Sequence, residues 1–487
     1  MGTPGPGLRY PHAGADRDRP ASCFLDLTAV IDSRTNASTA CCDTDDIQRV
    51  LTIQITFVVA DPPQVSYFCA YCIGSIFTEK PIIVHTEGNL ALLYIGVEKW
   101  NYVGLDPCAF YVYHANGGSD GEPSLTVLPQ PSGRPIIQRN QIGLLPGGGH
   151  DHGYSHSHSH DYYVAALSNA SEEPLHFELD LYSSKTRTWT VKKPVLILNE
   201  QQQQAGEFCH MTSKVITVGG DYGTMAFVDH SRGILFCNVL HGDRPHLYYV
   251  PLPTPPLHHS WLDCSNALRV RDIAVDAKAG RIRFVELCLH GETNGWQVQV
   301  VTWSRSAACN NQEEGWRQER DLFTAQLLLS GDLPEQLPRE SCWDGRGGPP
   351  PPPTQDLKRM YAEFPILSLH DDNTLYLMIS ERIVAWDRWV IAVDMANMTL
   401  QDVAHFRRSE NVRLKFRQSN ISSHLNMGAS PAARKRPGVE VLESSREKQC
   451  VLSTLDDMVS SWDAGTIKGA QYGDDMDLDM TTLLNEH

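Results

Sequence analysis

Residues 373–405 read NTLYLMISERIVAWDRWVIAVDMANMTLQDVAH. The run 373–377 leaves a polar turn and then alternates, which is the pattern of a β-strand. The runs 389–394 and 399–405 are separated by Met395, Ala396 and Asn397, a short break of the kind that joins the two strands of a hairpin. The stretch therefore predicts an inner strand followed by an outer hairpin.

The same pattern recurs along most of the chain. Further candidate inner strands are residues 88–94, 161–167, 233–237 and 280–285, and residues 177–182 with 187–189 form a second candidate outer hairpin. An inner pair followed by an outer pair every 40–50 residues or so is typical of a β-propeller blade. We therefore predict an all-β fold, a propeller-like array of four-stranded sheets. The alternative is two stacked antiparallel sheets, although closure into a ring would remove exposed sheet edges.

Composition divides the chain into a body and appended segments. We expect a disordered N-terminus at 1–20, a β-rich body at 21–406, a basic linker at 407–439 and an acidic, partly disordered and weakly helical tail at 440–487. Arg434, Lys435 and Arg436 in the linker are read either as a nuclear-import patch or as solvated charge. Surface inserts are expected at 147–161 (Gly and His), 201–204 (Gln) and 347–354 (Gly and Pro).

Charge and cysteine content limit the classes of function. The chain has 41 Lys and Arg against 58 Asp and Glu, a net charge of −17, which argues against binding to nucleic acid or to an anionic membrane. The start, residues 1–20, has no apolar segment of a signal peptide, and the most apolar run, 51–60, is too short to cross a bilayer. Thirteen cysteines, an odd number, indicate reduced thiols. We expect a soluble protein of the cytoplasm or nucleus that is not secreted.

Several stretches carry a resemblance to a known family. They are residues 62–72 (PPQVSYFCAYC), 231–240 (SRGILFCNVL), 248–256 (YYVPLPTPP), 271–287, 364–370 (FPILSLH) and 389–406. Together they resemble a plant family, expanded in grasses, named only as domain of unknown function 1618, with the family's module at about 219–370. The resemblance implies a plant source and a β-rich fold, and no reaction.

A shorter stretch resembles a second group of proteins. Residues 181–189 are similar to the outer hairpin of plant F-box-associated propeller domains. No helical F-box precedes this stretch, so the resemblance does not extend to membership of a ubiquitin ligase. The three low-complexity inserts depart from the pattern of the domain of unknown function 1618 family.

Two short motifs match catalytic or metal-binding patterns and lack the required context. Gly117–Gly121 fits the G-x-S-x-G nucleophile elbow, but Asn116 and Gly117 predict a hairpin turn and Pro123 prevents the helix that must follow. Cys69 and Cys72 have C-x-x-C spacing, but the preceding aromatic residues predict a strand, where positions three apart face opposite sides. We interpret these cysteines as buried thiols.

The densest group of metal-ligand side chains lies in the first insert. Alternate histidines in an extended segment project to one side, so several imidazoles can converge on Zn²⁺, Ni²⁺ or Cu²⁺. The candidate ligands are His150, His152, His156, His158 and His160. Near the C-terminus, Asp475, Asp477, Asp479 and Glu486 match EF-hand carboxylate positions, but Met480 stands where that loop requires glycine, so we expect no calcium site there.

Three functions remain open at this stage. We favour a non-enzymatic protein-interaction module whose protein partner and oligomeric state the sequence does not specify, with no cofactor. The first alternative is an enzyme with its site at the mouth of the β-rich body, to which His85, Asp221, His230 and Asp272 could contribute. The second alternative is metal binding by the His-rich insert.

Overall fold

The computed structural model divides the chain into a compact unit of residues 1–430 and a second unit of residues 431–487. The residues it describes all lie in the first unit. They are 20–425 without 46–49, 99–107, 119–120, 132–136, 148–160, 170–174, 199–207, 254–263, 277–279, 293–294, 308–314, 330–336, 338–356, 358–359, 381–386 and 408–415. The predicted N-terminal segment, the His-rich and Gln-rich inserts and the acidic tail therefore lie almost wholly outside the described residues.

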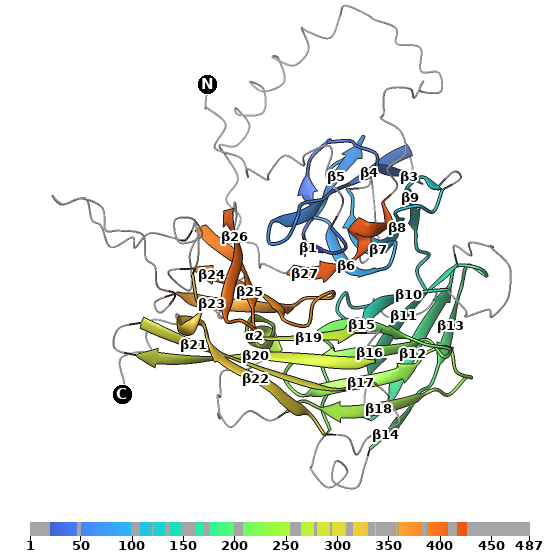
Figure 1. The fold of residues 1–487 in the computed structure, drawn as a ribbon. Helices are drawn as coiled ribbons and strands as arrows, with labels where there is room; N and C mark the ends of the chain where they lie inside the picture. Colours follow the sequence, from blue (N-terminus) through green and yellow to red (C-terminus); the bar gives the residue numbers. More distant parts are fainter. Residues whose placement is uncertain are drawn as a thin grey trace, which may run out of the picture. The chain divides into compact units, whose positions relative to one another are not determined.

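The described strands form six sheets, which we number I to VI in chain order (Figure 1). Sheet I runs β27 (Phe416–Ser419), β1 (Cys23–Asp26), β5 (Val65–Ile73), β4 (Val50–Val58) and β3 (Ala40–Asp45), with β2 (Val30–Ile31) beside β5. Sheet II runs β6 (Ile82–Glu87), β7 (Leu90–Gly96), β8 (Cys108–His114) and β9 (Ser124–Val127). Sheet III runs β10 (Ile142–Pro146), β11 (Tyr162–Asn169), β12 (Phe177–Ser183) and β13 (Thr188–Lys192).

The other three sheets repeat this order. Sheet IV runs β15 (Lys214–Gly219), β16 (Thr224–Asp229), β17 (Gly233–Asn238), β18 (His246–Pro251) and β14 (Val195–Ile197). Sheet V runs β19 (Arg271–Asp276), β20 (Arg281–Glu292), β21 (Gly295–Ser306) and β22 (Arg317–Phe323). Sheet VI runs β23 (Tyr361–Leu367), β24 (Thr374–Ser380), β25 (Asp387–Asp394) and β26 (Thr399–Arg407).

Helical structure is scarce among the described residues, as the pattern predicted. It consists of one short α-helix, α2 (Cys264–Val270), and the 3₁₀ turns η2 (Thr324–Gln326) and η4 (Ile421–His424). No helix in this part of the chain combines the length and the apolar content needed to cross a membrane.

The six sheets pack face to face around a ring, because both faces of most strands are apolar. On β16, Met225 and Phe227 pack against sheet III, whereas the alternate residues Ala226 and Val228 pack against sheet V. Each pair of successive sheets shares one such cluster of buried side chains, and a last cluster joins sheet VI to sheet I. The prediction of a propeller-like all-β fold is thus confirmed, and the arrangement is not that of two stacked sheets.

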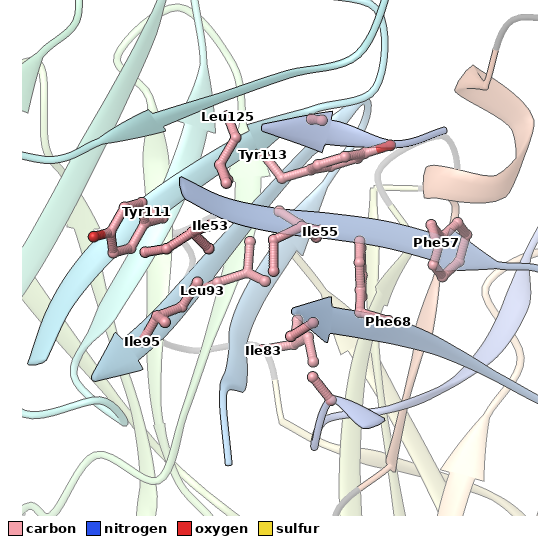
Figure 2. Close-up of a cluster of buried hydrophobic side chains, with 14 of the residues drawn as sticks. Ile53, Ile55, Phe57, Phe68, Ile83, Leu93, Ile95, Tyr111, Tyr113 and Leu125 are labelled. Carbon is pink, nitrogen blue, oxygen red and sulfur yellow. The ribbon is translucent and has the colours of Figure 1, made fainter. Parts of the chain in front are cut away.

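The cluster between sheets I and II illustrates this packing (Figure 2). Ile53, Ile55 and Phe57 alternate along β4, and Ile53 and Ile55 lie beside Leu93 and Ile95 of β7. Phe68 of β5 stacks at a tilt on Phe57, with ring centroids 4.6 Å apart. Burying side chains of this size gains about 1.5–3 kcal/mol each, so one cluster contributes a large share of the stability of both sheets.

The ring closes through strands from opposite ends of the chain. β27 pairs antiparallel with β1, with Cys23 opposite Ser419 and Asp26 opposite Phe416 (Figure 1). The ring of Phe416 stacks on that of Phe24 at 5.0 Å between centroids. β27 lies inside residues 407–439, the segment assigned from charge to a basic linker. Lys415 precedes this short strand and Arg417 lies within it, so its sequence was read as part of a charged linker.

Most of the strands predicted to be inner lie close to the ring axis. β7, β11, β20 and β24 are each second from the ring axis, within the predicted inner pair. β17, also predicted as inner, is third in sheet IV. Both predicted outer hairpins are correct, as β12 with β13 and β25 with β26.

Candidate functional site

The innermost strands surround a cavity of about 570 Å³, which we call the axial cavity. Its wall comes from β6, β15, β19, β23 and β27, so five of the six sheets contribute. A volume of this size is within the range of small-molecule binding sites. The cavity is therefore the candidate functional site of the described part of the chain.

Hydrogen bonds between neighbouring inner strands fix the wall of the axial cavity. Lys214 of β15 donates from Nζ to Asp272 Oδ1 at 2.6 Å and to the Ile273 carbonyl at 2.7 Å, both on β19. Asp272 Oδ2 in turn accepts from the Leu367 amide of β23 at 3.2 Å. One carboxylate thus links three sheets, which holds the site in place before any ligand arrives.

Burial favours the neutral form of His85 in the cavity wall and of His230. Burial, followed by the charge of Arg417, lowers the pKa of His85 to about 3, and its Nδ1 accepts from the Leu144 amide at 3.3 Å. Burial, together with Lys214, Arg417 and Arg271, holds the pKa of His230 well below its ordinary value. Neither imidazole therefore adds positive charge at neutral pH.

Arg417 lines the cavity and contacts no carboxylate among the described residues. Its Nη1 donates to the Val84 carbonyl at 3.2 Å, and among the described residues it forms no ion pair. Burial lowers the pKa of Arg417 to about 10, with Asp272 acting in the opposite direction, so the guanidinium stays charged at neutral pH. Asp272 is already paired with Lys214 and forms no ion pair with Arg417.

Two buried polar atoms on residues that line the cavity have no hydrogen-bond partner among the described residues. They are Thr86 Oγ1 and Gln418 Nε2. Buried polar groups are usually satisfied, and unsatisfied ones often mark positions where water or a ligand binds. These unsatisfied atoms favour a polar ligand or water in the axial cavity.

The residues proposed from sequence for a catalytic mouth are only partly brought together. His85 and Asp272 line the axial cavity. His230 is buried and bonds through Nδ1 to Ser213 Oγ at 2.7 Å. Asp221 is exposed, in the turn between β15 and β16, away from the cavity wall.

Sequence reasoning missed Lys214, Arg417 and Glu87. Arg417 was counted among the charges of the basic linker, and its alternation with the buried Gln418 was the only local signal that it belongs to a strand. Lys214 begins a run, KVITVG, whose first residue gave no sign of facing a carboxylate 58 residues away. Such pairings arise between strands of different sheets, so no local pattern encodes them.

The cysteine motif behaves as predicted. Cys69 and Cys72 lie on opposite faces of β5, in two different apolar clusters, and both are free thiols. Burial raises the pKa of Cys69 to about 11, which suppresses its thiolate.

Several other motifs fall outside the described residues. They are Ser119 of the elbow-like motif, the five histidines His150 to His160 and the acidic residues near the C-terminus. Metal binding by the histidines stays a prediction. Within the described ranges, no group of three or more His, Cys, Asp or Glu side chains is placed to hold a metal ion.

Comparisons with known proteins identify one domain. Residues 227–376 match the family model described as "Protein of unknown function (DUF1618)", which overlaps the module expected at 219–370. No curated protein sequence matches the chain.

Two solved structures are weakly similar to this chain. The hemagglutinin-neuraminidase of parainfluenza virus 5 shares 8% identity over 79% of this chain and 93% of the viral chain, with a TM-score of 0.27. The GDP-Man-dependent mannosyltransferase MPT-1 of Leishmania mexicana shares 8% identity over 67% of this chain and 84% of its own, with a TM-score of 0.19. Similarities this low support no conclusion about function.

Proposed function

We propose from the axial cavity that this protein, whose residues 227–376 match a family model that names no activity, is a non-enzymatic binding protein for a small organic anion. The observation that carries the proposal is the guanidinium of Arg417, which lines the axial cavity without a carboxylate partner among the described residues. A partly buried cation without a counter-ion costs free energy, and a guanidinium matches carboxylates and phosphates in shape and charge. An anionic ligand would remove that cost.

The surrounding groups support binding rather than catalysis. Ser213 Oγ, which donates to the Val228 carbonyl at 3.0 Å and contacts His230 Nδ1 at 2.7 Å, belongs to a residue outside the lining of the axial cavity. Lys214 Nζ is committed as a donor to two acceptors on β19.

Calorimetry on the purified full chain tests the proposal with hexanoate, succinate, benzoate and inorganic phosphate as probes. We expect at least one of them to bind, and Arg417→Met to weaken that binding about ten- to hundredfold, the loss of one or two charge-assisted hydrogen bonds. Arg417→Lys, which keeps the charge and loses the planar fork, should bind with intermediate affinity.

Arg139→Met is the matched control, since Arg139 is half-exposed and pairs with Glu79 away from the cavity wall. It should bind as the unmodified chain does. The proposal fails if none of the four anions binds, or if Arg417→Met binds them unchanged.

The protein-interaction role predicted from sequence is the second candidate. Tyr71 and Ile73 alternate on β5, project from the same face of sheet I, and are 41% and 51% exposed. Val50 and Ile76, also in or beside this sheet, are exposed too. Groups of exposed apolar side chains are a common feature of protein-binding surfaces.

Affinity capture from the source tissue tests this second role. A partner should be held by the unmodified chain and by the control Val191→Ser, which changes an exposed valine on β13, and lost with Tyr71→Ser and Ile73→Ser combined. Equal capture by both variants would exclude this surface.

A further inference from the structure

Glu87 is a second unpaired ionisable group on the wall of the axial cavity. It ends β6, and among the described residues it forms no hydrogen bond and no ion pair. Burial raises the pKa of its carboxyl to about 7. The cavity thus contains a guanidinium and a carboxyl group that do not neutralise each other through any direct contact.

Strand β6 gives the separation between Arg417 and Glu87. Arg417 bonds to the carbonyl of Val84, and Glu87 follows Val84 by three residues on β6. At 3.2–3.4 Å per residue the two backbone positions are roughly 10 Å apart along the strand. A ligand that reaches both groups therefore needs two functional groups separated by a chain of several atoms.

Part of the remaining lining suits an aliphatic connection, beside polar residues that include Thr217, Asp276 and His370. Ile216, Ile273, Val275 and Leu367 contribute apolar side chains or backbone to the same wall. A flexible polar linker would gain little there, whereas methylene groups would be removed from water at a gain of about 0.8 kcal/mol each.

We propose that the ligand is a small zwitterion of the ω-amino acid type, with its carboxylate at Arg417 and its ammonium group at Glu87. This inference rests on the proposed function. The carboxylate accepts from the guanidinium, the ammonium group donates to the Glu87 carboxylate, and the aliphatic chain lies between them. The ammonium group supplies the partner that Glu87 lacks, as the carboxylate does for Arg417.

Calorimetry with matched pairs of ligands tests this. The probes are the ω-amino acids from aminobutanoate to aminooctanoate, each paired with the fatty acid of the same chain length without the amine. For the unmodified full chain we expect the best amino acid to bind about tenfold or more tighter than its matched fatty acid. The advantage should peak at one chain length, because the two ends of the site are fixed.

Glu87→Gln should remove the advantage of the amine and leave the affinity for the fatty acid unchanged. Glu178→Gln, on β12 of sheet III outside the cavity wall, is the matched control and should keep the advantage. Thermal unfolding of each variant shows whether it remains folded.

The outcomes separate this inference from the proposed function. If fatty acids and amino acids bind the unmodified chain equally well, or if Glu87→Gln retains the preference for the amine, the zwitterion is excluded and the anion site stands. If neither class binds, both proposals fail.

Discussion

At the scale of single residues, ionisable groups in this protein differ mainly in whether burial is balanced by a partner. Arg271 and Glu286 face each other on β19 and β20, are both buried, and pair at 2.6 Å. Asp26, at the end of β1, is 8% exposed and accepts one hydrogen bond, from the Thr28 amide at 2.9 Å. Uncompensated burial of this kind makes the stability of the fold depend on pH.

Asp26→Asn should make the free energy of unfolding less sensitive to pH. Burial raises the pKa of Asp26 from 3.8 to about 7, against the weaker effects of Thr28 and Lys80. The folded chain then binds more protons than the unfolded chain between these values, so stability falls as pH rises through this window, by up to about 1.4 kcal/mol per pH unit. Asparagine keeps the acceptor for Thr28 and cannot ionise.

Urea unfolding of both chains between about pH 4 and pH 8 measures this effect. The variant should gain stability relative to the unmodified chain as pH rises, and the gain should level off above about pH 7, where Asp26 is ionised. Parallel stability curves across the range would contradict the prediction.

At the scale of elements, strands were easier to predict than their places in the sheets. The runs at 373–377 and 389–405 became β24, β25 and β26 because their turns and alternation are local properties. The position of β17 in its sheet was not a local property, since β15 and β16 lie between it and the axis and only the pairing order shows this. β27, with four residues, is too short for a periodic pattern to separate it from a charged linker.

Ser419→Cys should link the two ends of the ring covalently. Ser419 lies directly opposite the native Cys23 in the β1–β27 pair, and opposed residues of antiparallel strands have Cα separations that a disulfide accepts. Under mild oxidation we expect a bond that changes migration on a non-reducing gel and stabilises the fold by about 2–4 kcal/mol.

Ser423→Cys, four residues further on and exposed in η4, serves as the control and should form no bond with Cys23. Replacing Cys23 with alanine in the Ser419→Cys chain should abolish the link. A link that persists without Cys23 would argue against the β1–β27 pairing.

At the scale of the whole molecule, ring closure makes the sheets mutually dependent. Every sheet loses a packed face if either neighbour unfolds, because each shares one buried cluster with the sheet before it and one with the sheet after it. The first and last sheets are no exception, since Phe24 and Val65 of sheet I pack with Tyr376 and Val390 of sheet VI. Stability is therefore a property of the closed ring.

Ile53→Ala and Ile391→Ala should lower the midpoint of the same single unfolding transition. Ile53 lies between sheets I and II and Ile391 between sheets V and VI, and both are fully buried. Each substitution should cost about 2–5 kcal/mol. Circular dichroism and tryptophan fluorescence in urea should give coincident curves, and two separate transitions for either variant would contradict a closed ring.

The amino-acid sequence by itself determined the strands, the turns and the repetition that makes this an all-β, propeller-like protein. These follow from side chains within a few residues of one another, where alternation and turn chemistry act. The tertiary structure alone decided which strands face the axis, that β27 closes the ring, and that Arg417 lies beside Val84, 333 residues earlier in the chain. The physical reason is that the axial cavity is formed by one strand from each of several sheets, and only the packing of all six sheets brings those strands together.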